Sequence, residues 1–183
     1  MSATNRGAVR RAYDFYETPE EVTREFLFEY FEGDFHVILE PCAGSGKMVK
    51  VLRDRFPLAW IEANDIQDDS PIPYANKRYT LDFLKMVKGD VNYDLIFTNP
   101  PYSLAEEIIT HALETWSKAT VVMLLRLNFL GSQKRKPFWD KHPVSEIYVL
   151  SKRPSFTGKG TDATEYAWFV WRPDTAEQRV IAI

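Results

Sequence analysis

The sequence predicts an α/β fold: a Rossmann-like doubly wound mixed sheet, mostly parallel, with an antiparallel C-terminal strand. Short apolar runs of strand length alternate with amphipathic segments of helix length, and no repeat or low-complexity linker interrupts them. A turn containing glycines joins the first apolar run to a helix. With 183 residues, of which 45% are hydrophobic and 27% charged, the chain can bury one sizeable core.

The first element is a helix with good start signals. Thr18 can take the N-cap, Pro19 fits the first helical position and Glu21 completes a capping box. The later elements follow in order: a strand at 35–39, a turn at 42–46, a helix at 47–55, a strand at 59–64, a short helix or turn at 81–87, a strand at 93–97, a helix at 104–116, and strands at 120–125, 147–150 and 166–171. The last strand alternates in polarity, which favours an antiparallel position.

We expect one domain over residues 14–183, preceded by a flexible, polar and arginine-rich segment over residues 1–13. The longest apolar runs are far shorter than a membrane span, and the N-terminus lacks the apolar centre of a signal peptide. A cytoplasmic protein without membrane contact is therefore expected. One cysteine and three scattered histidines suggest neither a disulfide nor a metal site.

Asn99-Pro100-Pro101-Tyr102 is the most informative stretch of the chain. It directly follows the predicted strand at 93–97, so it lies at a strand's carboxyl end, where such sheets bind ligands. The two prolines deny the loop amide donors and fix its φ angles, so its carbonyls face a cavity. An amide, a carbonyl and an aromatic face then converge. This set suits a planar amine such as the exocyclic nitrogen of a nucleobase.

The turn Glu40-Pro41-Cys42-Ala43-Gly44-Ser45-Gly46 opens the second helix. Its small residues let a ligand approach the backbone, and helix-terminal N–H groups can bind an anionic group such as a carboxylate. A phosphate-binding P-loop would need glycine at Pro41 and serine or threonine at Met48. A dinucleotide site would need a third glycine at Val49, although Asp65 lies where its ribose-binding acid should be, and this alternative stays open. A turn that binds nothing is the other alternative.

These motifs carry a resemblance. Residues 40–46, Asp65, Asp82-Phe83 and residues 99–102 match, in order and spacing, the motifs of class I S-adenosylmethionine-dependent methyltransferases of the N6-adenine DNA group. Residues 16–19 resemble that group's N-terminal cofactor motif, and the order of motifs is that of the gamma arrangement. The resemblance covers residues 14–130. The C-terminal stretch with residues 153–156 and 166–171 is similar to small phage-encoded members.

The resemblance implies S-adenosyl-L-methionine as cofactor. The glycine turn would pack against the methionine moiety, Asp65 would accept hydrogen bonds from the ribose hydroxyls, and Asp82 would accept one from the adenine amine, with Phe83 lining the ring. Asp65 and Asp82 could instead cap strand ends, and Glu40 could contact the cofactor's amino group or cap the turn. The implied cofactor-binding residues are Tyr16, Thr18, Pro19, Glu40, Pro41, Cys42, Ala43, Gly44, Gly46, Asp65, Ile66, Asp82, Phe83 and Asn99. Cys42 has no evident base, so a packing role is expected for it.

The implied catalytic residues are Asn99, Pro100, Pro101 and Tyr102. Asn99 Oδ1 and the Pro100 carbonyl would accept the two N–H bonds of an adenine amine and align its lone pair with the methyl group. Tyr102 would stack on the extruded base, with core packing as its alternative role. A cytosine-C5 mechanism would need a cysteine in this loop, which has none.

The resemblance implies DNA as the partner, and the concentration of basic residues in the C-terminal part of the chain is compatible with a phosphate-contacting face. Residues 1–117 contain 12 Lys/Arg against 20 Asp/Glu, and residues 118–183 contain 11 against 6. A solvated surface is the alternative reading of these charges. Candidate substrate contacts are Arg126, Asn128, Lys134, Arg135, Lys136 and Phe156.

The chain has no room for a separate target-recognition domain, so a partner subunit could supply target binding. The alternative functions are methyl transfer to RNA adenine or guanine or to protein glutamine, or a methyltransferase-like subunit that needs a partner for activity. Labelled methyl transfer separates these functions.

Overall fold

The computed structural model describes residues 17–67, 71–156, 163–175 and 177–183. At its centre is an eight-stranded sheet with the strand order β3-β2-β1-β4-β5-β7-β6-β8. Strand β7 runs antiparallel to β5 and β6, and every other neighbouring pair is parallel. The strands are β1 (Val37–Glu40), β2 (Trp60–Asn64), β3 (Lys77–Tyr79), β4 (Leu95–Thr98), β5 (Thr120–Arg126), β6 (Glu146–Val149), β7 (Tyr166–Trp171) and β8 (Arg179–Ala182). The predicted mostly parallel α/β sheet is confirmed.

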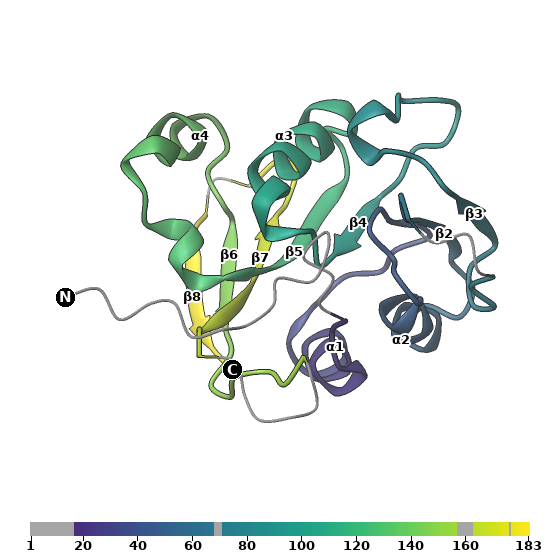
Figure 1. Cartoon of the computed structure of the whole chain (residues 1–183), viewed down its shortest axis with the longest axis horizontal. Helices are drawn as coiled ribbons and strands as arrows, with labels where there is room; N and C mark the ends of the chain where they lie inside the picture. The colour runs from purple at the N-terminus through teal and green to yellow at the C-terminus, as the bar shows by residue number, and fades with distance from the viewer. Residues whose placement is uncertain (1–16, 68–70, 157–162, 176) are drawn as a thin grey trace.

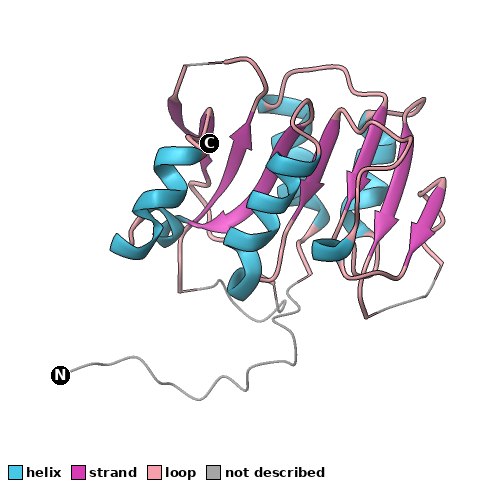
Figure 2. Cartoon of the chain, turned by 90° about the horizontal axis from the view of Figure 1, so that it is seen from above, coloured by secondary structure: helices cyan, strands magenta, loops and turns pink. Residues whose placement is uncertain are grey.

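Helices cover both faces of this sheet (Figures 1 and 2). One face carries α1 (Glu20–Glu25), its π-helical continuation η2 (Phe26–Tyr30) and α2 (Lys47–Arg55). The other carries η3 (Phe83–Lys85), α3 (Ala105–Thr115) and α4 (Lys136–Lys141). The remaining short turns are η4 (Tyr102–Leu104), η5 (Leu127–Leu130) and η6 (Gln133–Arg135). This three-layer arrangement gives one apolar core on each side of the sheet.

Aromatic rings fill the core beneath η2. The ring of Phe26 stacks on Trp168 of β7 with centroids 4.8 Å apart, and Phe97 of β4 contacts the same indole at 4.9 Å. All three side chains are fully buried. Because β4, β5 and β7 are covered by helical layers on both faces, their sequences are nearly continuous apolar runs. This packing fixes the strand ends from which the loops project.

The structure corrects several predicted elements. Strand β7 is buried along its whole length, so its expected alternation is wrong, and β8 follows it as a further strand. Neither β3 nor β8, both at sheet edges, nor the short helix α4 was expected from the sequence. The edge strands contain exposed, charged residues and so lack the apolar signal of interior strands.

The predicted capping box is also wrong. Pro19 occupies the N-cap of α1, and no side chain makes a capping hydrogen bond there. The hydroxyl of Thr18 accepts a hydrogen bond from the Asn99 side chain instead. The expected flexible segment at residues 1–13 lies outside the described residues. No helix in the described part of the chain has the length and apolar character needed to cross a bilayer.

Candidate active site

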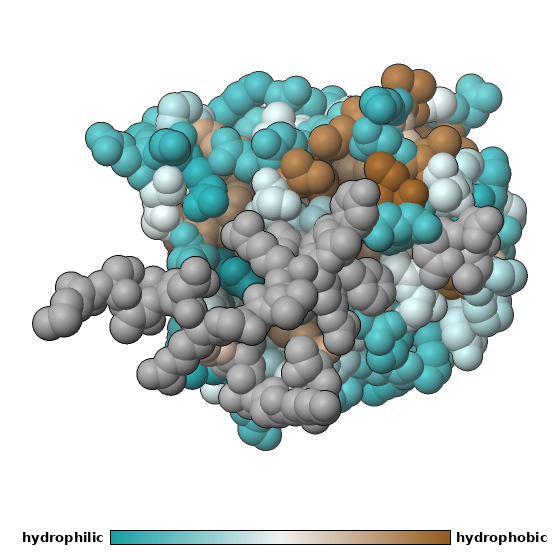
Figure 3. All heavy atoms as spheres, viewed as in Figure 1, coloured by the Kyte–Doolittle hydropathy of each residue, from teal (hydrophilic) through white to brown (hydrophobic). Residues whose placement is uncertain are grey.

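A cavity of about 130 Å³ opens at the carboxyl ends of β1, β2 and β4, where the predicted motifs meet. Leu81 and Leu104 line it and remain 48% and 43% exposed. Figure 3 shows hydrophobic residues gathered on the surface in the region of α3. The predicted residues that line it are Thr18, Glu40, Pro41, Cys42, Ala43, Gly44, Asp65, Ile66, Asp82, Phe83, Asn99 and Pro101. Segments far apart in the sequence therefore build one site.

Four predicted residues do not line this cavity: Pro19, Gly46, Pro100 and Tyr102. Pro19 begins α1, and Pro100 is buried. Gly46 has a φ of +85°, and a Cβ at this position would lie 2.6 Å from the Ile72 side chain. Glycine is therefore needed there for the turn itself. Tyr16 lies outside the described residues.

Glu40 ends β1 and is 1% exposed. Thr98 Oγ1 donates a hydrogen bond to its Oε1 at 3.3 Å, while Oε2 has no hydrogen-bond partner in the described structure. Burial raises the pKa of this carboxyl well above its ordinary value, the charge of Asp65 adds to the effect, and the Thr98 hydrogen bond opposes it. A buried polar atom without a partner is costly, so the site is suited to an N–H or cationic donor placed in the cavity.

Asp65, which follows β2, supports the glycine turn. Its Oδ2 accepts a hydrogen bond from Gly44 N at 2.9 Å, and its Oδ1 accepts one from Gln67 N at 2.9 Å. Gly44 has a φ of +51°, a conformation that glycine adopts without strain. The Asp65 carboxylate thus caps backbone N–H groups after β2 and in the glycine turn, which fits its alternative role as a cap. Its oxygens still have lone pairs that can accept hydrogen bonds from donors in the cavity.

Asp82 and Phe83 form the opposite wall. Asp82 Oδ1 caps η3 by accepting from Leu84 N at 3.1 Å, and Oδ2 lies 3.3 Å from Lys85 Nζ. Phe83 is 4% exposed and stacks on Trp116 with centroids 5.8 Å apart. The ring is therefore held in place by the core beneath α3, and this wall presents a carboxylate beside an apolar surface.

Asn64 joins the two walls and was not identified from the sequence. Its Nδ2 donates to the carbonyls of Pro41 at 2.9 Å and Leu81 at 3.0 Å, and its Oδ1 accepts from Leu81 N at 3.0 Å. The side chain is 1% exposed and lines the cavity. An asparagine at the end of a strand, directly after the buried Ala63, was the available signal.

The chain just before α1 closes over the site. Asn99 Nδ2 donates to Thr18 Oγ1 at 3.0 Å, which fixes the orientation of the Asn99 amide. Glu17 accepts a hydrogen bond from Ser45 and forms an ion pair with Lys47 at 2.5 Å. Ser45 and Lys47 also line the cavity. These contacts tie the N-terminal segment to both the glycine turn and the predicted catalytic loop.

Tyr102 lies beside the first cavity, in an aromatic and cationic cluster. The Arg126 guanidinium lies 4.8 Å from the centre of its ring, and the ring of Tyr166 lies 5.9 Å away. Phe156 contacts Tyr166 with centroids 5.0 Å apart. Burial, followed by the neighbouring Tyr166, raises the pKa of the Tyr102 hydroxyl well above its ordinary value, so Tyr102 is neutral at physiological pH.

A second cavity, of about 160 Å³, is lined by Tyr102, Ala105, Leu125, Arg126, Asn128, Phe129 and Arg135. It brings three predicted substrate residues, Arg126, Asn128 and Arg135, next to Tyr102. Lys134 and Lys136 are exposed and do not line it, and Lys136 pairs with Asp140. Phe156, the remaining predicted contact, does not line this cavity.

Cys42 and possible metal ligands also bear on the chemistry of the site. Burial of the Cys42 thiol, together with the charges of Glu40 and Asp65, raises its pKa well above the ordinary value. The thiol therefore stays protonated, which is incompatible with a nucleophilic role. Within the described ranges, His, Cys, Asp and Glu side chains form no group of three or more placed to hold a metal ion.

No family model and no curated protein sequence matches the chain. Solved structures do match. A protein described as a class I S-adenosylmethionine-dependent methyltransferase from Listeria monocytogenes has a TM-score of 0.67 at 13% identity, over 91% of this chain and 65% of its own. The type I restriction-modification methyltransferase subunit from Streptococcus thermophilus has a TM-score of 0.67 at 12% identity, over 92% and 47%. The 23S rRNA methyltransferase ErmE has a TM-score of 0.59 at 20% identity, over 90% and 71%.

The chain spans about half to two thirds of the length of the first two of these structures. Each of the three matches covers 90% or more of the present chain. The comparisons therefore show that this chain has the Rossmann-like fold of class I S-adenosylmethionine-dependent methyltransferases.

Proposed function

We propose that the protein transfers a methyl group from S-adenosyl-L-methionine to the N6 amine of adenine in DNA. The observation that carries this proposal is the position of Asn99. Its amide directly follows β4, lines the first cavity and is oriented by Thr18, while Tyr102 presents an aromatic ring next to it. An acceptor, an aromatic face and the cavity that holds the predicted cofactor residues thus adjoin one another, as methyl transfer to a planar amine requires.

The cavity fits the cofactor at three points. The Glu40 Oε2 atom, buried without a hydrogen-bond partner, can accept from the ammonium group of the methionine moiety. Asp65 can accept from the ribose hydroxyls beside the Gly44 turn. Asp82 and the ring of Phe83 can hold the adenine by its amine and its face. The bound cofactor would supply an electrophilic methyl group on a sulfonium centre.

The residues of the catalytic loop act on the amine. Its lone pair is delocalised into the adenine ring, so it is a poor nucleophile until its geometry changes. Asn99 Oδ1 and the Pro100 carbonyl accept hydrogen bonds from its two N–H groups. These hydrogen bonds favour a pyramidal nitrogen and align its lone pair with the methyl group. The new N–C bond forms as the C–S bond breaks with its electrons remaining on sulfur, and one proton leaves the nitrogen to water.

DNA is proposed as the substrate because one similar structure is a type I restriction-modification subunit and the second cavity is lined by two arginines. RNA is the second candidate, since ErmE is described as an rRNA methyltransferase. A partner subunit for target recognition is also proposed, because the similar structure from Streptococcus thermophilus is described as a subunit of a restriction-modification system.

The test is methyl transfer by the purified chain from labelled cofactor to DNA, RNA and protein, followed by nucleoside and amino-acid analysis. We expect labelled N6-methyladenine from DNA. Asn99→Ala is expected to abolish transfer while cofactor affinity stays nearly intact. Label found only in RNA or protein would reassign the substrate. A chain that binds no cofactor would overturn the proposal entirely.

A further inference from the structure

The segment that carries Tyr102 is the wall between the two cavities. Pro101 and Leu104 line the first cavity, whereas Tyr102 and Ala105 line the second. A base that stacks on Tyr102 would therefore have the first cavity on one side of this wall and the second on the other. The sugar and phosphates attached to that base must leave in a direction compatible with this arrangement.

The second cavity has the polar lining of an anion site. Two guanidinium groups, from Arg126 and Arg135, and the amide of Asn128 line it, and no carboxylate is among its lining residues in the described part of the chain. Its other lining residues are apolar or aromatic. Guanidinium groups match the geometry of phosphate oxygens, and an apolar surround strengthens such contacts.

Contacts with neighbouring side chains and one carbonyl hold both arginines in place. Arg126 Nε donates to Tyr166 Oη at 3.3 Å while its guanidinium lies over Tyr102. Arg135 lies 4.4 Å from the centre of the Phe129 ring and donates to the Phe129 carbonyl at 3.3 Å. Its Nε is 3.5 Å from a Glu106 carboxylate oxygen. The two side chains are thus positioned from different elements, β5 and η6, around one space.

We propose that the second cavity binds a backbone phosphate directly flanking the target nucleotide, held by Arg126 and Arg135. This inference rests on the proposed function and makes it more specific. A base on Tyr102 is one sugar away from its flanking phosphates, and Arg126 already contacts that ring. Gripping the phosphate of an extruded nucleotide fixes the position of its base without reading its sequence.

The experiment is a double-mutant cycle in which a substitution in the protein is combined with a single neutral phosphate in the oligonucleotide. Short oligonucleotides with one adenine carry a methylphosphonate at one position, either flanking the adenine or farther away. Their affinities are measured for the wild type, Arg126→Gln and Arg135→Gln. Arg135→Gln leaves the contact with Tyr102 untouched, so it tests the site even where Arg126→Gln perturbs the aromatic cluster. Lys134→Gln removes a nearby exposed charge outside the cavity and is the matched control.

We expect one flanking methylphosphonate to weaken binding to the wild type about tenfold, the effect of one charge-assisted hydrogen bond. The same substitution should have little effect on Arg126→Gln or Arg135→Gln, because their contact is already lost. Lys134→Gln should lower the affinity for all oligonucleotides by the same factor, and the flanking methylphosphonate should weaken its binding as much as it weakens binding to the wild type. Equal penalties in all four proteins, or an equal loss of coupling in Lys134→Gln, would refute the phosphate site.

Cofactor binding and methyl transfer to the unsubstituted oligonucleotide are measured on the same preparations. Methyl transfer to DNA adenine without phosphate coupling would overturn this inference and leave the proposed function standing. A methylphosphonate penalty that disappears in the arginine variants, without methyl transfer to DNA adenine, would support the phosphate site and overturn the proposed function. A wild-type chain that binds no oligonucleotide would refute the phosphate site irrespective of its cofactor binding.

Discussion

At the scale of single residues, the proposed contact of Glu40 with the cofactor's ammonium group would link stability to cofactor binding. The raised pKa of Glu40, caused by burial, means that folding favours the neutral carboxyl. The stability of the ligand-free protein therefore falls as the pH rises above the unfolded-state pKa and levels off above the folded-state pKa. Glu40→Gln keeps the shape without the charge. We expect it to stabilise the ligand-free protein near neutral pH by about 1 kcal/mol or more.

The same variant should bind the cofactor about tenfold or more weakly, because it loses a charge-assisted contact to the ammonium group. Thermal unfolding across pH and calorimetric titration with cofactor measure the two effects. Glu107→Gln, on the exposed side of α3, is the control and should change neither. A Glu40→Gln protein that is less stable at neutral pH but binds cofactor normally would contradict this role.

Thr18 makes the second prediction at this scale. Its hydroxyl accepts a hydrogen bond from Asn99 Nδ2 and so fixes which amide atom faces the substrate. Thr18→Val keeps the volume and removes the acceptor. We expect kcat to fall about tenfold, with a much smaller change in cofactor affinity, and Thr18→Ser to restore the rate. A loss confined to cofactor affinity would instead place Thr18 in cofactor binding alone.

The sequence motifs predicted the cavity-lining positions best within two short stretches, residues 40–44 and the pair Asn99 and Pro101. Thr18 shows where this fails. The capping rule considers the next three residues, whereas its actual partner lies 81 positions away. The partners of Asn64 are likewise set by the meeting of two loops and not by neighbouring residues. Such contacts exist only once the sheet has formed.

At the scale of elements, Asn64 holds the loop after β1 to the loop that follows β3. We expect Asn64→Ala to destabilise the protein by about 1–3 kcal/mol, since two carbonyls and one N–H lose their partner. Cofactor affinity should also fall, because Pro41 and Leu81 line the cavity. Asn76→Ala is the matched control: Asn76 accepts from Ile61 N and Arg53, and it does not line the cavity.

Both variants should lose stability, but only Asn64→Ala should lose cofactor affinity when both are measured well below their unfolding temperatures. Similar affinity losses in the two would indicate a general effect of instability. Elements in the interior, such as α2 and β7, have the bounds that the sequence predicted. The edge strands and α4 were missed because tertiary contacts, not their own apolar patterns, define them.

At the scale of the whole molecule, several residues of the C-terminal basic excess are paired with carboxylates, most of them within the same part of the chain and two with α3. Arg135 meets Glu106, and Lys141 meets Glu114, both on α3. The sequence could show the asymmetry of charge but not this pairing. The basic surface available to the proposed nucleic acid is therefore narrower than the basic stretch. Arg135 lines the second cavity while it also contacts Glu106, so at the proposed phosphate site its charge would be shared between the carboxylate and the phosphate.

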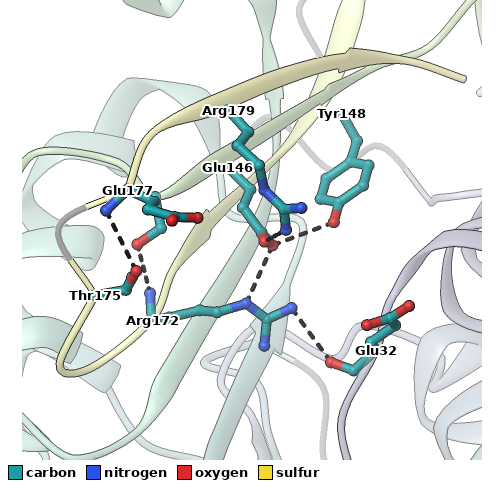
Figure 4. A network of polar contacts seen from close by, with 8 residues as sticks. Glu32, Glu146, Tyr148, Arg172, Thr175, Glu177 and Arg179 are labelled. Atoms are coloured by element: carbon teal, nitrogen blue, oxygen red, sulfur yellow. Dashed lines mark hydrogen bonds and ion pairs between the residues drawn. The ribbon is translucent and has the colours of Figure 1, made fainter.

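The ends of the described chain are joined through Glu146, the first residue of β6 (Figure 4). Its carboxylate pairs with Arg172 at 3.1 Å and with Arg179 of β8, and accepts from Tyr148 Oη at 3.2 Å. Arg172 also donates to the carbonyl of Glu32, after η2, at 3.2 Å. One buried carboxylate thus connects β6, β8, the end of β7 and the helical segment at the start of the fold.

Burial acts to raise the pKa of Glu146, but hydrogen bonds and charges of Arg179 and Arg172 outweigh it and lower the pKa. Its stabilising contribution is therefore present above the unfolded-state pKa and is lost as the pH falls through the lower folded-state value. We expect Glu146→Gln to cost about 1–3 kcal/mol at pH 7 and to reduce the acid dependence of unfolding. Asp54→Asn breaks the exposed pair with Arg24 and should cost less than about 0.5 kcal/mol. Urea unfolding at pH 7 and pH 4 measures both, and equal costs for the two variants would show that the Glu146 network stabilises no more than a surface ion pair.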